Sequence, residues 1–154
     1  MRKQQVQSTR LDMAGILRQV EQRMDYMLRE YGGEIAGPEA WPAALGYAPW
    51  IEEAWTNYIS NGLKYGGSPP RLQLGADLQD GKIRFWVRDN GPGIDEEAQA
   101  KLFAEFSRLD TVRAEGHGLG LSIVRRIIER LGGSVGVESE LGSGSLFFFT
   151  LPAA

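Results

Sequence analysis

The sequence contains no cysteine and only one histidine among its 154 residues. The absence of cysteine excludes disulfides, thiolate metal sites and thiol catalysis. A single histidine argues against metal sites built from several imidazoles, and a serine hydrolase triad would have to use His117 as its base. A hydrophobic core can form here without disulfides or structural metals, because a domain of about 150 residues buries roughly 68–70% of the surface that its unfolded chain exposes.

The sequence also has little excess charge of either sign, because 17 Lys and Arg residues stand against 20 Asp and Glu residues. The resulting net charge of −3 gives no overall basic surface for nucleic acid. Apolar runs stay well short of the roughly 18 residues of a membrane span, and no apolar stretch typical of a signal peptide follows Met1–Gln5. We therefore expect a cytoplasmic location, no nucleic-acid partner and no direct membrane contact.

Two segments have the apolar period of a helix. Apolar residues recur at three- and four-residue intervals over 13–28, where Asp12 can cap the start and Gly32-Gly33 can end the helix. A second helical pattern covers 49–65, with proline in an acceptable first-turn position. The proline- and glycine-rich stretch 32–49 is expected to be a connection inside one domain, because both flanking helices are needed for one core.

Four strands are expected in two pairs. Apolar and polar residues alternate over 72–78 and 83–87, on either side of Asp80-Gly81, which predicts an antiparallel hairpin. Residues 134–139 and 145–151 predict a second pair near the end of the chain.

Two further helices are expected between the strand pairs, a short one at 95–102 and a longer one at 119–131. Strand pairs separated by helices, with each strand apolar mainly on one face, predict an α+β fold. We expect a two-layer sandwich, in which helices cover one face of a single sheet.

The helix expected at 49–65 carries a polar stripe made of Glu53, Asn57, Ser60, Asn61 and Lys64. Two asparagines one turn apart beside a lysine can hold a metal and a phosphate together. Amide oxygen suits Mg²⁺, which usually shares substrate phosphates. The alternative interpretation is a solvated helix face.

A carboxylate at the end of a strand gives a second indication of a site. By the period of two, Asp89 projects to the same apolar side as Phe85 and Val87, so it needs a donor. The exocyclic amine of adenine is a suitable donor, and the glycines of Asn90-Gly91-Pro92-Gly93 let backbone approach a ligand closely. The alternative is an aspartate that caps an ordinary turn.

A glycine-rich turn, Gly116-His117-Gly118-Leu119-Gly120, leads directly into the helix expected at 119–131. Free N–H groups and the positive end of a helix dipole favour polyanions. The dinucleotide-binding fingerprint is not met, because position 121 is Leu where a third Gly or Ala is needed. A Walker A sequence is also absent.

Taken in order, these segments resemble the catalytic, ATP-binding domain of sensor histidine kinases, within the wider group that includes gyrase, Hsp90 and MutL. The resemblance covers residues 9–152, nearly the whole chain. Its five boxes are an N box at 57–65, a first glycine box at Asp89–Gly93, an F box at Phe103–Phe106, a second glycine box at Gly116–Gly120 and a closing glycine turn at Gly142–Ser145.

The resemblance implies a Bergerat-type fold with a mixed sheet, and a site for ATP and Mg²⁺. It implies that Asn61 binds the metal, with Asn57 in the same site, and that Lys64 contacts phosphate. It also implies that Tyr65 contacts the ribose or adenine edge and that Asp89 accepts a hydrogen bond from the adenine amine. The other nucleotide contacts that it implies are Gly91, Gly93, Gly116, His117, Gly118, Leu119 and Gly120.

The resemblance also implies a mobile lid at 104–115. Its Arg108 and Arg113 would neutralise charge on the transferring phosphoryl group, which is where electrostatic stabilisation matters in such reactions. Together with Asn57 and Lys64, they form the expected catalytic set. The alternative is that Arg108 and Arg113 are solvated side chains of a loop.

The function implied is transfer of the γ-phosphate of ATP to a histidine on a separate dimerisation domain, for relay to a response regulator. The sequence supplies no acceptor, because its only histidine, His117, falls inside the proposed nucleotide site. We expect residues 1–8 to be the end of an interdomain linker and 9–154 to be the catalytic domain. The dimerisation domain would belong to the same parent protein or act in trans.

Three other functions stay open: an ATPase of the gyrase, Hsp90 or MutL kind, an anti-sigma-type serine kinase, and a non-catalytic nucleotide-sensing module. The ATPases place a general-base Glu one turn before the magnesium asparagine. Here that position is Asn57, and Glu53 lies a further turn away. This arrangement disfavours activation of water as the main chemistry.

Overall fold

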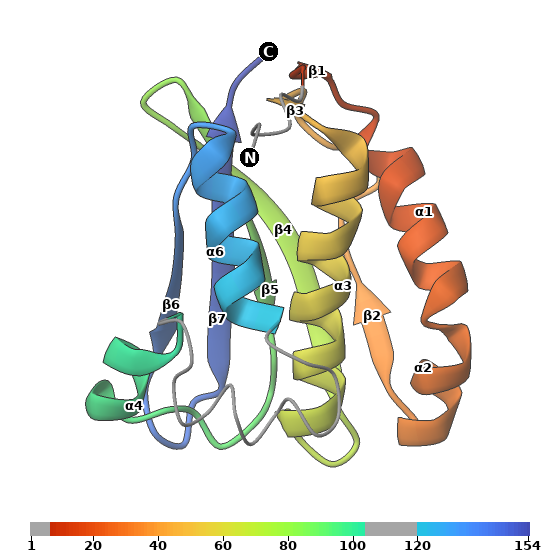
Figure 1. The fold of residues 1–154 in the computed structure, drawn as a ribbon. Helices are drawn as coiled ribbons and strands as arrows, with labels where there is room; N and C mark the ends of the chain where they lie inside the picture. The colour runs from red at the N-terminus through yellow and green to blue at the C-terminus, as the bar shows by residue number, and fades with distance from the viewer. Residues whose placement is uncertain (1–6, 104–119) are drawn as a thin grey trace, which may run out of the picture.

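The computed structural model describes residues 7–103 and 120–154. Within them, a five-stranded sheet is covered on one face by helices (Figure 1), which confirms the two-layer α+β prediction. The elements are β1 (Thr9–Arg10), α1 (Met13–Arg23), α2 (Asp25–Tyr31), β2 (Glu34–Ala36), β3 (Leu45–Gly46), α3 (Ala48–Tyr65), β4 (Arg71–Gln79), β5 (Lys82–Arg88), α4 (Glu96–Lys101), α6 (Gly120–Arg130), β6 (Val135–Ser139) and β7 (Ser145–Pro152).

The sheet has the strand order β2-β4-β5-β7-β6 and is mixed, because β2 runs parallel to β4 and the other neighbours are antiparallel. The predicted hairpin at Asp80-Gly81 is confirmed. Both residues have a positive φ, 49° and 78° respectively, as a two-residue turn that matches strand twist requires. The short strands β1 and β3 form a separate antiparallel pair.

The single helix predicted over 13–28 is wrong in one respect, because the chain forms two helices that meet at Met24. The start is as predicted, and Asp12 accepts a hydrogen bond from the N–H of Gly15 at 3.1 Å. Met24 leaves helical geometry while its side chain stays buried. The apolar period therefore runs through the break and hides it from the sequence.

The stretch 32–49, which the sequence predicts to be a connection, also contains two short strands. It contains β2, which forms one edge of the sheet, and β3, which pairs with β1. These strands have three and two residues, too few for a period of two to be visible in a sequence. Gly32, with a φ of 63°, ends α2 as expected of a glycine at this position.

The core lies between α3 and the middle of the sheet. The ring of Trp55 lies edge-on to those of Phe149, at 5.1 Å, and Phe85, at 6.1 Å. Two polar groups in this core are paired: the Trp55 indole donates to the sulfur of Met13, and the Tyr58 hydroxyl donates to a β7 carbonyl. Burial raises the pKa of the Tyr58 phenol well above its usual value, so it stays protonated. This packing fixes α3 on the sheet.

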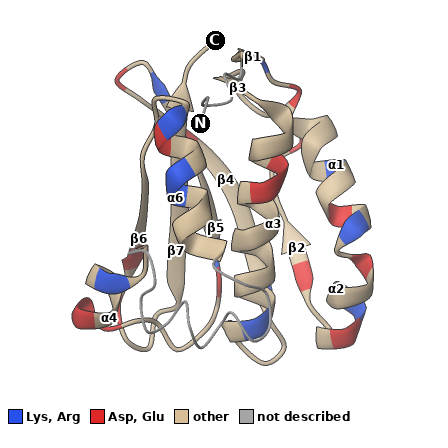
Figure 2. Ribbon diagram, viewed as in Figure 1, with Lys and Arg blue, Asp and Glu red and all other residues tan. Residues whose placement is uncertain are grey.

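Charged residues of both signs are interspersed on α1, α2 and α3 (Figure 2). In the described parts of the chain, no helix combines the length and apolar character that crossing a membrane requires.

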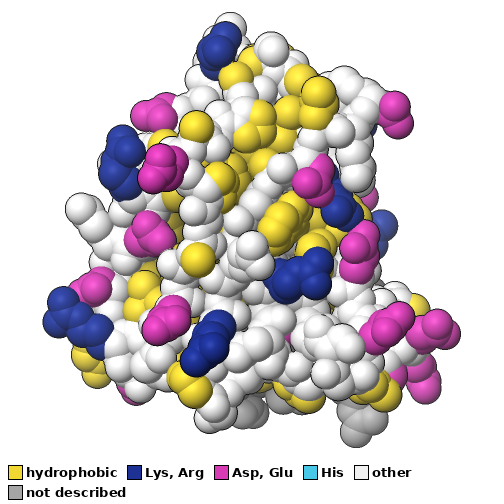
Figure 3. Space-filling view, turned by 180° about the vertical axis from the view of Figure 1, so that it is seen from behind, with side chains coloured by type: hydrophobic (Ala, Val, Ile, Leu, Met, Phe, Trp, Pro, Cys, Tyr) yellow, Lys and Arg dark blue, Asp and Glu magenta, His cyan; other side chains and the backbone are white. Residues whose placement is uncertain are grey.

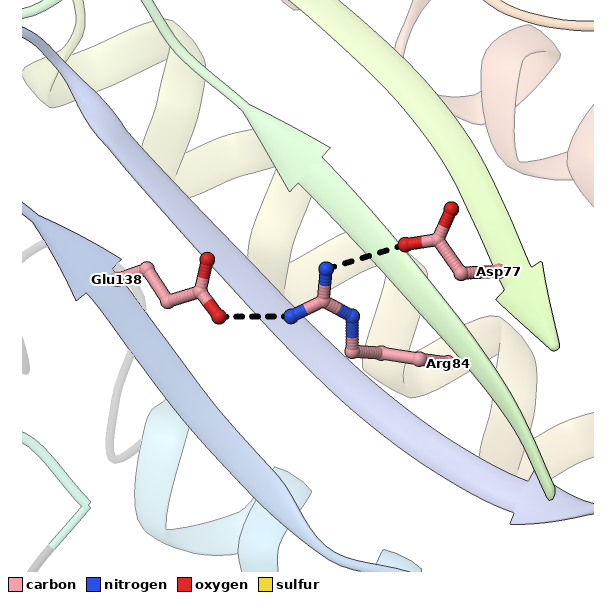
Figure 4. Close-up of polar contacts among 3 residues, drawn as sticks. All are labelled: Asp77, Arg84 and Glu138. Carbon is pink, nitrogen blue, oxygen red and sulfur yellow. Dashed lines mark hydrogen bonds and ion pairs between the residues drawn. The ribbon is translucent and has the colours of Figure 1, made fainter. Parts of the chain in front are cut away.

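On the opposite face of the sheet, apolar side chains lie beside charged ones (Figure 3). The rings of Trp86 and Phe148 lie over Gly75 and Gly136 of neighbouring strands, where any Cβ would meet the rings. Arg84 of β5 donates to Asp77 of β4 at 3.0 Å and to Glu138 of β6 at 2.7 Å (Figure 4). To reach Glu138 it crosses β7, where its guanidinium lies 5.2 Å from the centre of the Phe148 ring.

We expect Arg84→Met to lower the free energy of unfolding by about 1–2 kcal/mol, because it removes two charge-assisted bonds and a cation–π contact. The loss stays modest because Asp77 and Glu138 keep 45% and 59% of their side chains exposed and so remain hydrated. Urea unfolding measures the change. The control is Arg88→Met on the same strand, whose side chain is exposed; equal stability of the two variants would contradict the assigned role.

Candidate functional site

The predicted polar stripe of α3 is largely withdrawn from water. Asn57 and Ser60 are only 8% and 6% exposed, and Asn61 and Lys64 are half-buried. Glu53, one turn earlier, is exposed. The stripe is therefore not a solvated helix face, and its buried amide needs specific partners.

The side chain of Asn57 is held in one orientation. Its Nδ2 donates to the backbone carbonyl of Glu53 at 2.8 Å and to the Glu53 carboxylate at 3.2 Å. The amide oxygen consequently points away from Glu53 and toward Gly120, where a Cβ would collide with it. The carbonyl of Asn57 accepts from the Ser60 hydroxyl at 3.1 Å. An oriented amide oxygen thus faces the start of α6.

Asp89 stands directly after β5 and is half-buried, as its position in the strand predicts. Its Oδ1 accepts hydrogen bonds from the N–H groups of Gly91, at 2.9 Å, and Ser145, at 3.1 Å. Its own N–H donates to the carbonyl of Ser145 at 2.8 Å. The carboxylate therefore caps the turn, as in the alternative interpretation. The same bonds also fix its position between β5 and β7.

The glycines of this loop are required by backbone packing. A Cβ at Gly91 would lie 2.8 Å from the carbonyl oxygen of Tyr65, and a Cβ at Gly93, where φ is 83°, would collide with the carbonyl of Glu140. A Cβ at Gly144, where φ is 76°, would likewise collide with the carbonyl of Asp89. The loop after β5 is therefore pressed between the end of α3 and the β6–β7 turn.

The structure brings three of the predicted segments together: the second half of α3, the loop after β5, and the first residue of α6, all toward one end of the molecule (Figure 1). Of the F box, Phe103 is half-buried with its ring 6.4 Å from that of Phe147. The predicted residues that lie outside the described residues are Arg108, Arg113, Gly116, His117, Gly118 and Leu119, together with the rest of the lid at 104–115.

Lys64 and Tyr65 form the end of α3 beside this loop. Partial burial lowers the pKa of the Lys64 ammonium from its usual value, and none of the described carboxylates forms an ion pair with it. An anionic ligand beside this ammonium would raise its pKa again. Tyr65 is 42% exposed, as a side chain at the rim of a site would be.

The oxygen donors of this region fit a magnesium ion that is shared with phosphate. The described residues contain no cluster of three His, Cys, Asp or Glu side chains that would hold a metal by themselves. The amides of Asn57 and Asn61 lie one turn apart on the half-buried stripe. Mg²⁺ accepts such neutral oxygens because it keeps several waters and binds substrate phosphates.

One residue in the site was missed by reasoning from the sequence. In the sequence Asn90 is only one residue of a glycine-rich loop, but in the structure its amide forms hydrogen bonds with the backbone of the segment that joins α3 to β4. Its place between Asp89 and Gly91 was the only available signal. Asparagine in such a turn commonly bonds to nearby backbone, although its partners here are about 20 positions away in the sequence.

Comparison with known proteins shows the family to which the chain belongs. The family described as histidine kinase-, DNA gyrase B-, and HSP90-like ATPase matches residues 46–154. The methanogenesis regulatory histidine kinase FilI of Methanothrix harundinacea is 40% identical over 127 residues, which are 81% of this chain and 14% of that protein.

Solved structures have the same fold. Full-length ShkA, solved in complex with AMPPNP, has a TM-score of 0.82 and 35% identity, over 98% of this chain and 32% of that one. The catalytic domain of histidine kinase ThkA has a TM-score of 0.81 and 24% identity, over 96% of this chain and 97% of that domain.

The chain spans 14% of the length of FilI and 32% of full-length ShkA, so it corresponds to one part of these larger proteins. The predicted N box on α3, the Asp89 loop and the start of α6 all lie within the matched residues 46–154. The chain belongs to the family of histidine kinase-, DNA gyrase B- and HSP90-like ATPases.

Proposed function

We propose that this chain is the catalytic domain of a sensor histidine kinase, which binds ATP with Mg²⁺ and transfers its γ-phosphate to a histidine of a separate dimerisation domain. A response regulator then takes the phosphoryl group from that histidine. The main support is that α3 meets both other parts of the site: Asn57 lies against Gly120 at the start of α6, and the residues after Tyr65 lie against the loop that holds the fixed carboxylate of Asp89. The relative FilI, which is named as a histidine kinase, supports the same reaction.

Each part of the site has a task in this proposal. Asp89 accepts from the adenine amine, and Tyr65 lies along the ribose or adenine edge. Lys64 binds a phosphate oxygen, for which its partly buried ammonium is suited. Asn61 and Asn57 would hold Mg²⁺, which neutralises phosphate charge when it is bound. The residues of the chain thus act by holding and orienting the triphosphate, which provides most of the catalysis in phosphoryl transfer.

The second candidate, an ATPase, is disfavoured by a specific contact. The residue one turn before Asn61 is Asn57, an amide that cannot accept a proton from water. The nearest carboxylate on this stripe, Glu53, accepts a hydrogen bond from Asn57 at 3.2 Å and lies a further turn away. Its observed role is therefore to orient the amide.

We expect the isolated chain to bind ATP but to incorporate almost no phosphate itself, because its only histidine is His117 in the second glycine box. Supplied with labelled ATP and a panel of histidine-bearing dimerisation domains, it is expected to label one of them. The label should be lost in acid and stable in base, as phosphohistidine is.

The outcomes of this experiment separate the candidate functions. Acid-stable label on a serine would decide for a serine kinase, and release of free phosphate without labelling would decide for an ATPase. Stoichiometric acid-labile label on His117 of the isolated chain would contradict the prediction that an external acceptor is required. The His117→Gln variant identifies that case, because it would lose the label.

A further inference from the structure

Asn90 makes three hydrogen bonds to the segment that connects α3 to β4. Its Oδ1 accepts from the backbone N–H groups of Gly67, at 3.1 Å, and Arg71, at 2.8 Å. Its Nδ2 donates to the carbonyl of Pro69 at 3.1 Å. A side chain of the loop after β5 thus binds the backbone of another loop at three points.

The two loops are in close contact at this place. A Cβ at Gly67 would lie 2.5 Å from Nδ2 and 2.7 Å from the carbonyl oxygen of Asn90. On the other side of the same loop, a Cβ at Gly91 would lie 2.9 Å from Cα of Gly66. The backbone that follows Tyr65 is therefore packed directly against the backbone that follows Asp89.

The chemistry at position 90 is specific for asparagine. Its amide is short enough to stay in the turn, and it offers an acceptor that takes two N–H groups together with a donor for one carbonyl. Aspartate would keep the acceptor but would set a carboxylate oxygen against the Pro69 carbonyl. Alanine would remove all three bonds.

We propose that Asn90 is a positioning residue, which fixes the end of α3 relative to Asp89. It thereby sets the spacing between the phosphate-binding residues, Asn61 and Lys64, and the adenine-binding carboxylate. This inference rests on the proposed function, because it takes the two ends of the nucleotide to bind at α3 and at Asp89. Asn90 acts through the two loops and need not touch the nucleotide.

A fixed spacing matters only for a ligand that reaches both parts of the site. In Asn90→Ala, Asp89 keeps its bonds to Gly91 and Ser145, and α3 keeps its packing on the sheet. The affinity for adenosine, which occupies the adenine part alone, is therefore expected to change less than about twofold. The affinity for AMPPNP with Mg²⁺, which spans both parts, is expected to fall about tenfold, because binding would then have to order the two loops at a cost comparable to that of one or two net hydrogen bonds.

The experiment measures both ligands on the full chain, by calorimetry for AMPPNP with Mg²⁺ and by NMR titration for adenosine. Asn90→Asp retains the two N–H contacts and is expected to fall between wild type and Asn90→Ala. It also gives a second test if Asn90→Ala folds poorly. Ser68→Ala, in the same connecting segment and exposed, is the matched control and should bind both ligands as wild type does.

Three outcomes would overturn the proposal. They are wild-type affinity of both Asn90 variants for AMPPNP, an equal loss of adenosine and AMPPNP binding, and a loss in Ser68→Ala as large as in Asn90→Ala. An equal loss would mean that Asn90 only supports the fold. Asp89→Asn, measured in parallel, tests the site itself, since unchanged adenosine binding in that variant would contradict the adenine assignment and not the role of Asn90.

Discussion

Asn61→Ala is expected to abolish phosphoryl transfer and to remove the dependence of nucleotide binding on Mg²⁺. Asn61 lies one helical turn after Asn57, on the half-buried stripe of α3, and among the described residues its side chain has no hydrogen-bond partner. Its amide oxygen is the proposed metal ligand, and a methyl group cannot replace it. Because stabilisation of phosphate charge is central to such a reaction, we expect the rate of transfer to fall by at least about 100-fold.

Calorimetry with AMPPNP measures this effect, in the presence of Mg²⁺ and after its removal with EDTA. Wild type should bind more weakly without Mg²⁺, whereas Asn61→Ala should bind equally weakly in both conditions. Gln73→Ala, on an exposed position of β4 outside the site, is the control. If Asn61→Ala kept the full enhancement by Mg²⁺, the assignment of the metal to this residue would be wrong.

Local patterns in the sequence predicted the parts of the fold that depend on local chemistry. The hairpin at Asp80-Gly81 follows from turn residues and alternation, and the start of α1 follows from Asp12 as its cap. The polar stripe of α3 could be recognised because a helix brings residues 57, 61 and 64 to one side whatever surrounds it. The partial burial of Asp89 could be predicted in a similar way, because the two-residue period of β5 carries on to the residue that directly follows it.

Features that depend on contacts between distant segments could not be predicted in this way. The turn at Met24 does not disturb the apolar period, and β2 exists as a strand only because β4 pairs with it. The sequence predicts that the glycines after β5 give a ligand access to backbone, yet Gly91 and Gly93 make room for Tyr65 and for the β6–β7 turn. The role of Asn90 likewise depends on the connection from α3 to β4.

The same contacts link the predicted boxes of this chain to one another. Asn57 meets the start of α6, Tyr65 meets Gly91, and the carbonyl of Asp89 meets Gly144, so each segment limits the side chains that the next can carry. A glycine in one segment therefore makes room for atoms of another segment, and a side chain added at that glycine would displace the neighbouring segment. The site is one packed unit assembled from α3, β5, α6 and the β6–β7 turn.

Asp89→Asn is expected to weaken ATP binding by about 100-fold while leaving the fold intact. Oδ1 of Asp89 already accepts from the N–H groups of Gly91 and Ser145. An asparagine would keep its single oxygen at these two donors, because leaving buried N–H groups unpaired is costly. In the proposed site its NH₂ group would then face the adenine amine, so that two donors would meet where we propose that the wild type pairs an acceptor with a donor.

This orientation leads to a change in specificity as well as a loss of affinity. A purine nucleotide with a carbonyl oxygen in place of the amine, such as inosine triphosphate, can accept from the asparagine NH₂ group, although it is a poor partner for the wild-type carboxylate. The ratio of affinities for ATP and inosine triphosphate, measured by competition with a fluorescent nucleotide, is therefore expected to fall strongly in Asp89→Asn. Asp95→Asn provides the control, because that carboxylate caps α4 and lies outside the site. An unchanged ratio in Asp89→Asn would mean that the carboxylate caps the turn without recognising the base.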